Sequence, residues 1–339
     1  MNRERLNVGI IGAGRIGRVH AESLAFRLPE ARTMAITDVN RNAAQAVADR
    51  CGIAKVAVTS AEILDDPQIQ AVLICSSTDT HADLIVKAAE AGKHIFCEKP
   101  IALSLAPIDI ALAAVEAAGV KLQIGFNRRF DANFARVRQA VVSGEIGTPS
   151  LLHIISRDPE PPPLAYIKVS GGMFADMTIH DFDMARFLIG DVVEIYASAG
   201  VMVDPEIGNA GDVDTALIVL RFENGVIGTI DNSRRAVYGY DQRVEILGSK
   251  GKIATENRFP NQAMVSNSTS VYKDLPLNFF MERYQESYTS ELQSFVEAIL
   301  EDRPTSVTGH DGRVPVAMAM AARKSYEQNR PVRLEEIVA

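Results

Sequence analysis

The residues with the clearest chemical potential lie in the second half of the chain, where two carboxylates flank a histidine. Asp176, His180 and Asp183 are spaced i, i+4 and i+7, so on a helix they would share one face. A neighbouring carboxylate orients an imidazole and stabilises its protonated form, which suits a general base. The same residue types could hold a divalent ion, and a lone histidine is more often a buried structural residue. The two flanking acids favour the base.

A lysine at the end of a predicted strand is the second candidate. Lys99 follows the apolar run 94–98, and a fixed positive charge there could stabilise a developing alkoxide. A solvated lysine is the plainer alternative. If Lys99 shares a pocket with His180, its charge argues against a metal, and the three cysteines have no C-x-x-C or zinc-like spacing. We therefore expect no metal.

A base and a positive charge could together act on the hydroxyl of a secondary alcohol. Its oxidation would also need an acceptor for the hydride, and residues 7–17 predict a site for one. An apolar strand leads into G-x-G-x-x-G and then a helix. Gly12 permits the turn, Gly14 lets a pyrophosphate approach the backbone, and Gly17 lets the helix pack on the sheet. The helix N-terminus attracts the phosphates. Asp38, 21 positions after Gly17, would bind the ribose of NAD and repel the 2′-phosphate of NADP, although it could instead cap a helix.

Other polar residues follow predicted strands at the edge where open parallel sheets bind ligands. After the fourth strand come Ser76, Ser77, Thr78 and His81, which could equally form a capped turn. Arg128 and Arg129 lie at a predicted domain boundary, where one could bind substrate or cofactor oxygens. Paired arginines are otherwise usually surface residues.

Two classes of structural element must position these residues. Residues 1–126 alternate Val/Ile-rich strands with helical stretches, which predicts a parallel sheet in a dinucleotide-binding domain. Residues 127–339 predict an α+β domain with a large, mostly antiparallel open sheet and helices at about 130–142, 174–189, 288–301 and 312–327. Asn224-Gly225 marks a hairpin between two alternating runs. The open sheet needs one face covered, which predicts an oligomer.

Composition excludes several function classes. The chain has 339 residues, 47% hydrophobic, and a net charge of −8, which disfavours nucleic acid and anionic membranes as partners. No apolar stretch reaches the roughly 18 residues of a membrane span, and we see no signal peptide. We expect a cytoplasmic protein.

These motifs together resemble the Gfo/Idh/MocA oxidoreductase family over essentially the whole chain. The resemblance rests on the glycine motif 12–17 with His20, on Glu98-Lys99-Pro100, on residues 125–130, and on Asp176-x-x-x-His180. Within the family, residues 156–159 and 170–183 are most similar to bacterial inositol 2-dehydrogenases.

The resemblance implies a Rossmann domain that binds NAD, and a second domain whose open sheet mediates homotetramers. It implies oxidation of myo-inositol to scyllo-inosose, with Lys99, Asp176 and His180 as the catalytic residues. The cofactor-binding residues that it implies are Gly12, Gly14, Arg15, Ile16, Gly17, Asp38, Ser76, Ser77, Thr78, His81, Glu98 and Lys99. The substrate-binding residues that it implies are Lys99, Arg128, Arg129, Asp158, Asp176, His180, Asp183, Tyr238 and Tyr240, with one of each Arg and Tyr pair left open.

Ser156 and Asp158 stand where some inositol dehydrogenases carry histidine and asparagine, so the exact polyol stays open. One alternative is a dehydrogenase or reductase of the same family that acts on an aldose. Another is a non-catalytic dinucleotide-binding regulator, against which the intact Lys99, Asp176 and His180 argue.

Overall fold

The computed structural model describes residues 5–338, which divide into two compact units. The first unit contains the chain up to Phe130 together with Glu286–Val316. The second contains Asp131–Gln285 and the chain from Ala317 onward. The predicted boundary at residues 126 and 127 differs by only a few positions. The return of Glu286–Val316 to the first unit is a feature that the sequence pattern did not predict.

The first unit is built on a six-stranded sheet in the order β3-β2-β1-β4-β5-β6, parallel throughout the described residues. Its strands are β1 (Leu6–Ile11), β2 (Ala31–Thr37), β3 (Lys55–Val56), β4 (Ala71–Ile74), β5 (His94–Glu98) and β6 (Leu122–Gly125). The helices between them are α1 (Arg15–Phe26), α2 (Arg41–Cys51), α3 (Ala61–Leu64), α4 (Thr78–Glu90) and α5 (Leu105–Ala118). The predicted parallel sheet is confirmed.

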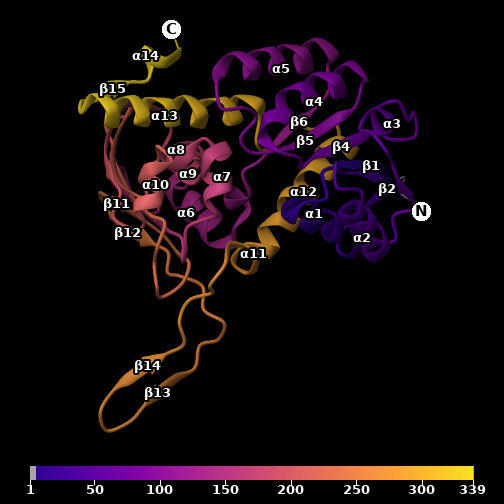
Figure 1. Ribbon diagram of the computed structural model, residues 1–339. Coiled ribbons are helices and arrows are strands. Elements are labelled where there is room, and N and C mark those ends of the chain that lie inside the picture. The colour runs from indigo at the N-terminus through magenta and orange to yellow at the C-terminus, as the bar shows by residue number, and fades with distance from the viewer. Residues whose placement is uncertain (1–4, 339) are drawn as a thin grey trace. The chain divides into compact units, whose positions relative to one another are not determined.

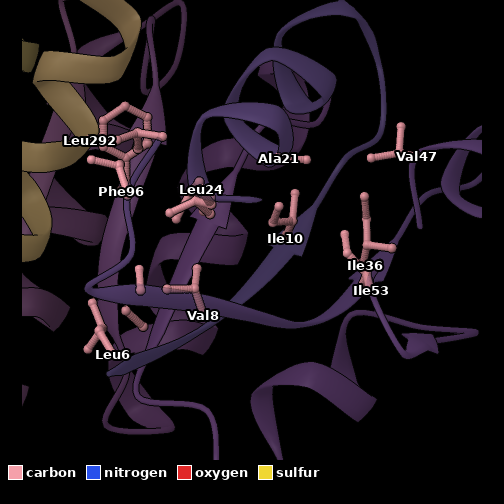
Figure 2. Packing of buried hydrophobic residues seen from close by; sticks show 14 of the residues in the cluster. Leu6, Val8, Ile10, Ala21, Leu24, Ile36, Val47, Ile53, Phe96 and Leu292 are labelled. Carbon is pink, nitrogen blue, oxygen red and sulfur yellow. The ribbon is translucent and has the colours of Figure 1, made fainter. Parts of the chain in front are cut away.

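The returning segment belongs to the first unit because it fills that unit's core. Helix α12 (Gln285–Leu300) places Leu292 in the same buried cluster as Val8, Leu24 and Phe96 (Figure 2). Phe96 also meets Phe295 of α12 edge to face, with 5.8 Å between ring centroids. Burial of large side chains of this kind contributes about 1.5–3 kcal/mol each, so α12 is an integral layer of this unit.

The second unit is built on a sheet whose seven described strands follow the order β12-β11-β7-β10-β9-β8-β15. These are β7 (Pro149–Arg157), β8 (Val192–Gly200), β9 (Thr215–Phe222), β10 (Ile227–Ser233), β11 (Asp241–Gly248), β12 (Gly251–Ala254) and β15 (Val332–Arg333). Only the β7–β10 pairing is parallel among the described strands. Gly225 between β9 and β10 has φ +86°, as the predicted Asn-Gly hairpin requires. A separate hairpin, β13 (Met264–Ser266) with β14 (Val271–Lys273), forms an arm (Figure 1).

One face of the seven-stranded sheet is covered by helices of its own unit, as Figure 1 shows for α6, α8 and α9. The remaining elements are the 3-10 turn Asn127–Phe130 in the first unit, and α6 (Ala132–Val142), α7 (Leu164–Ser170), α8 (Gly172–Asp176), α9 (Ile179–Ile189), α10 (Pro205–Asn209), α11 (Phe280–Arg283), α13 (Gly309–Gln328) and α14 (Glu335–Val338). Along β9 burial alternates strictly, with Leu217 and Val219 exposed on the other face. That face carries apolar side chains which nothing in the described chain covers.

The structure differs from the sequence pattern at residues 174–189, which form two helices instead of one. Helix α8 ends at Asp176 and α9 begins at Ile179. Between them the N–H groups of both Met177 and Thr178 bind the carbonyl of Met173, at 3.0 and 2.9 Å. The Thr178 hydroxyl also donates to the Asn232 side chain at 2.6 Å. Hydrogen bonds to distant residues therefore interrupt a helix that the sequence pattern predicted to be continuous.

In the described part of the chain, no helix combines the length and the apolar character needed to cross a lipid bilayer.

Candidate active site

The glycine loop of the first unit depends on two very close backbone contacts. Gly12 has φ +107°, and a Cβ there would lie 2.5 Å from the Cys75 backbone. A Cβ on Gly17 would lie 2.0 Å from the Gly12 carbonyl oxygen. Gly14 is different, because a Cβ there would meet nothing within 4 Å. The conformation of the loop therefore does not require glycine at this position. The open space beside Gly14 fits the approach of a phosphate.

The start of α1 also suits an anion. Gly14 is the N-cap of α1, and no side chain caps the helix. The free N–H groups and the positive end of the helix dipole therefore remain for a ligand. Arg15 and Ile16 form the first turn. These features fit the pyrophosphate of a dinucleotide.

Asp38 is held beside this loop. Its Oδ2 accepts from the Ala13 N–H at 2.6 Å, and its Oδ1 accepts from the Asn40 N–H at 2.7 Å. Asp38 does not cap the following helix, because Asn40 is the N-cap of α2; Asp38 instead ties the end of β2 to the glycine loop. Each carboxylate oxygen keeps a second lone pair that could accept a ribose hydroxyl.

The ends of β4 and β5 are joined by His81. Its Nδ1 lies 2.8 Å from the Pro100 carbonyl and its Nε2 lies 3.0 Å from the Ser76 carbonyl. His81 is only 2% exposed, so its evident role here is to connect two strand ends, and direct contact with a cofactor stays a prediction. Ser77 is the N-cap of α4 and Thr78 its first residue, and the Ser77 side chain makes no capping hydrogen bond. Lys99 follows β5 and forms a cis peptide bond with Pro100.

His20, Glu98 and Glu291 form a buried cluster at the end of β5, next to Lys99 in the sequence. The Nε2 of His20 is 2.7 Å from Oε1 of Glu98. A carboxylate oxygen of Glu291, on α12, joins them, and the three side-chain atoms lie within 4.8 Å of one another. Burial, and then the charge of Glu98, raise the pKa of Glu291 well above its usual range. A protonated carboxylic acid is a poor metal ligand. The cluster therefore favours a proton on Glu291 over a bound metal ion. No sequence signal pointed to Glu291, because it lies far from the motif.

The second unit holds the predicted base. Asp176 is the last residue of α8 and His180 the second residue of α9, so both flank the helix break and both are half-buried. Asp176 Oδ1 accepts from the Tyr166 hydroxyl at 2.8 Å, and Oδ2 lies 3.7 Å from Nη1 of Arg234. Asp183 is buried, one turn further along α9. Tyr166 and Arg234 are partners of Asp176 that the sequence analysis missed, because neither lies in a recognisable motif.

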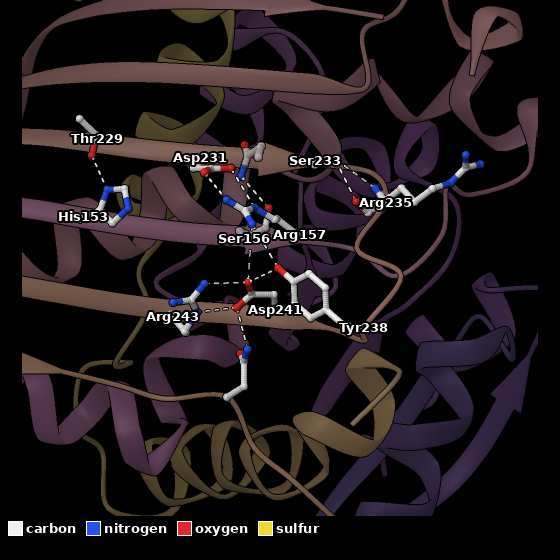
Figure 3. Close-up of polar contacts among 12 residues, drawn as sticks. His153, Ser156, Arg157, Thr229, Asp231, Ser233, Arg235, Tyr238, Asp241 and Arg243 are labelled. Atoms are coloured by element: carbon white, nitrogen blue, oxygen red, sulfur yellow. Dashed lines mark hydrogen bonds and ion pairs between the residues drawn. The ribbon is translucent and has the colours of Figure 1, made fainter. Parts of the chain in front are cut away.

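The other substrate candidates have different surroundings. Arg129 pairs with Asp311 at 3.0 Å, and Arg128 beside it is buried. The Tyr238 hydroxyl accepts from Arg157 at 3.1 Å and donates to Asp241 at 2.6 Å (Figure 3). Tyr238 therefore belongs to a polar network across β7, β10 and β11, in which Arg157 also binds Asp231.

Two further predicted positions flank this network. Tyr240 is buried, with its ring edge-on to Tyr284 at 6.0 Å. Asp158 joins the end of β7 to the chain after β10, because its N–H donates to the Ser233 carbonyl and its own carbonyl accepts from the Ala236 N–H. A substrate role for Asp158, Tyr238 or Tyr240 stays a prediction.

Comparison with known proteins identifies the family. Residues 6–126 match the oxidoreductase family with an NAD-binding Rossmann fold, and residues 134–254 match the GFO/IDH/MocA C-terminal domain. The chain belongs to the GFO/IDH/MocA oxidoreductase family. It is therefore an NAD-dependent dehydrogenase, as the glycine loop and Asp38 predicted.

Individual relatives extend over nearly the full chain. The myo-inositol 2-dehydrogenase of Thermotoga maritima is 48% identical over 98% of this chain and 100% of its own length. The inositol 2-dehydrogenase of Rhizobium meliloti is 45% identical over 96% of this chain and 98% of its own. The Lactobacillus casei scyllo-inositol dehydrogenase, solved with NAD(H) and scyllo-inositol, is 29% identical with a TM-score of 0.92, covering 98% and 100% of the two chains.

Replacing Gly14 separates ligand binding from folding. We expect Gly14→Ala to leave the thermal unfolding midpoint unchanged, because its Cβ meets nothing within 4 Å. It should weaken NAD⁺ binding at least about tenfold, ~1.4 kcal/mol, by crowding the pyrophosphate. Calorimetric titration of NAD⁺ measures this. The matched Gly17→Ala should instead lower the unfolding midpoint, and equal NAD⁺ affinity in Gly14→Ala and wild type would contradict the assignment.

Glu291 should make the stability of the protein depend on pH. Its folded-state pKa is raised, so the stability from this group is complete below the unfolded value of about 4.3 and is lost as pH rises toward the folded value. Glu291→Gln cannot ionise, so its unfolding midpoint should fall less than that of wild type between about pH 5 and 8. Thermal unfolding across pH measures the slopes. The exposed Glu116→Gln is the control, and parallel slopes for Glu291→Gln and wild type would reject the assignment.

Proposed function

We propose that this dehydrogenase oxidises one secondary alcohol of an inositol with NAD⁺, converting myo-inositol to scyllo-inosose. The observation that carries the proposal is full-length identity of 48% and 45% to two proteins named as inositol 2-dehydrogenases. The glycine loop, the free α1 N-terminus and Asp38 fit NAD, which supplies the hydride acceptor when bound.

The roles of the side chains follow from the chemistry of alcohol oxidation. His180 takes the hydroxyl proton on its imidazole as the carbon-bound hydrogen leaves as hydride, and Asp176 stabilises the resulting imidazolium. Lys99 stabilises negative charge on the oxygen during the reaction. Asp183 and one of Arg128 and Arg129 hold the remaining hydroxyls. These assignments are supported by residue type and by the half-buried position of Asp176 and His180 at the helix break.

The assembly is also proposed from the surface of the second unit. Strands β7, β9, β10 and β11 expose apolar side chains on the face that their own helices leave open, namely Leu151, Leu217, Val219, Ile227 and Leu247. Burying such a face removes apolar area from water. We propose a cytoplasmic homotetramer formed through this face, whose mass sedimentation velocity would measure.

An aldose is the alternative substrate, because the wall of the pocket differs from the pattern of some inositol dehydrogenases. Ser156 is fully buried and donates to the Gln242 side chain at 3.1 Å, so a small hydroxyl occupies the position where some inositol dehydrogenases carry a histidine. A non-catalytic regulator is the remaining alternative.

A substrate panel tests these alternatives. NADH absorbance would be followed with inositol stereoisomers and with aldoses, each with NAD⁺ and NADP⁺. The proposal expects the highest kcat/KM with myo-inositol and NAD⁺. Preference for an aldose would replace the substrate, and no turnover with any polyol or sugar would favour the regulator.

Replacing His180 tests the base. We expect His180→Ala to lower kcat about 10²- to 10⁴-fold, the usual contribution of general acid–base catalysis, with NAD⁺ affinity unchanged. The matched control is His310→Ala, because His310 is an exposed histidine in the first turn of α13. Wild-type turnover in His180→Ala would remove His180 from the mechanism.

A further inference from the structure

Arg234 is a buried cation that the proposed chemistry does not yet use. It is the first residue after β10 and is 1% exposed. Its N–H donates to the Asp214 carbonyl at 2.8 Å, which fixes the backbone from which the side chain extends. A buried guanidinium is costly unless carboxylates compensate its charge, so its partners identify its role.

Two carboxylates share this guanidinium. Nη1 lies 3.7 Å from Asp176 Oδ2, and Nη2 lies 3.5 Å from Asp212 Oδ2. Nε and Nη2 have no hydrogen-bond acceptor in the described structure, so Arg234 acts through charge more than through directed hydrogen bonds. Without Arg234, two negative groups would face each other in a poorly solvated site.

Asp212 connects the same cluster to the other end of α8. Both of its carboxylate oxygens accept from the Met173 N–H at 3.0 Å. Gly172 beside it has φ +78°, and a Cβ there would lie 2.6 Å from Asp212 Oδ1. Asp212 therefore holds the start of α8 while Arg234 holds Asp176 at its end.

Several charged and titratable groups of the same unit surround Asp176. Tyr166 of α7 donates to Oδ1, Arg234 faces Oδ2, Asp212 pairs with the other side of Arg234, and His180 is the second residue of α9, across the helix break. A donor on one oxygen and a cation near the other hold the carboxylate in one orientation.

We propose that Arg234 is a positioning residue, which together with Asp212 clamps α8 and fixes the orientation of the Asp176 carboxylate. The inference rests on the proposed function, in which Asp176 assists His180. Arg234 acts through Asp176 and is assigned no contact with substrate or cofactor.

The kinetic test uses full-length protein and compares Arg234→Met, Arg234→Lys and Asp212→Asn. Arg234→Met should lower kcat about 10²-fold, since a small misplacement of a catalytic group costs about that much. The NAD⁺ dissociation constant and the KM for inositol should change less than about threefold, because neither ligand is bound by Arg234. Arg234→Lys restores the charge and should recover at least about tenfold of the lost kcat.

The matched control is Arg235→Met. Arg235 is adjacent in sequence but exposed, and its side chain donates to the Val203 carbonyl at 3.4 Å. It should keep wild-type kcat. A lower kcat at unchanged NAD⁺ affinity and KM, with recovery in Arg234→Lys, is a result that a purely structural ion pair would not produce.

A double-mutant cycle separates this inference from the proposed function, because it needs no turnover. The unfolding midpoints of Arg234→Met, Asp176→Asn and the double variant should be non-additive if the two side chains interact. If wild type oxidises no polyol while the cycle is non-additive, the proposed function fails and the clamp stands.

Three results would overturn the inference. These are wild-type kcat in Arg234→Met, no recovery of kcat in Arg234→Lys over Arg234→Met, and additive midpoint shifts in the cycle. If Arg234→Met does not fold, Arg234→Lys and Asp212→Asn still decide the question, because both should then lower kcat measurably at unchanged NAD⁺ affinity.

Discussion

Close contact between backbones at the turn from β1 into α1 is the constraint on which the first unit depends. Gly12 lies against the backbone after β4, and Gly17 lies against Gly12, with no room for a Cβ at either position. These contacts let β1 sit between β2 and β4 and let α1 begin immediately after the turn. The ends of β2, β4 and β5 then reach one edge of the sheet, which is where Asp38, Ser76 and Lys99 are found.

The second unit is organised differently, around buried polar groups. Arg234 is compensated by Asp176 and Asp212, while Asn232, near the end of β10, binds both Thr178 and Asp181. Such groups contribute little net stability but are costly to mispair, so they specify one arrangement of α8 and α9. The helix break between Asp176 and His180 is part of that arrangement, and a continuous helix would turn the two residues differently.

Spacing pointed to Asp176 and His180 through a helical face that the structure does not form. The i, i+4 relation of Asp176 and His180 predicted one helical face, yet the chain leaves regular helix between them. The periodicity of a sequence reflects only its local preference for helix. It does not indicate that Thr178 hydrogen-bonds to a side chain 54 positions away. The same limit explains why Tyr166, Arg234 and Glu291 were missed.

The sequence by itself determined the parallel sheet, the NAD cofactor and the Asn-Gly hairpin, because these depend on short motifs and on alternation along single elements. The glycine motif that begins at Gly12 is an example. Tertiary structure alone decided that Glu286–Val316 completes the first unit and that Glu291 joins His20 and Glu98. It also decided which cation faces Asp176. Each of these depends on contacts between distant segments, and the energy of such a contact is set by burial and charge that no local pattern encodes.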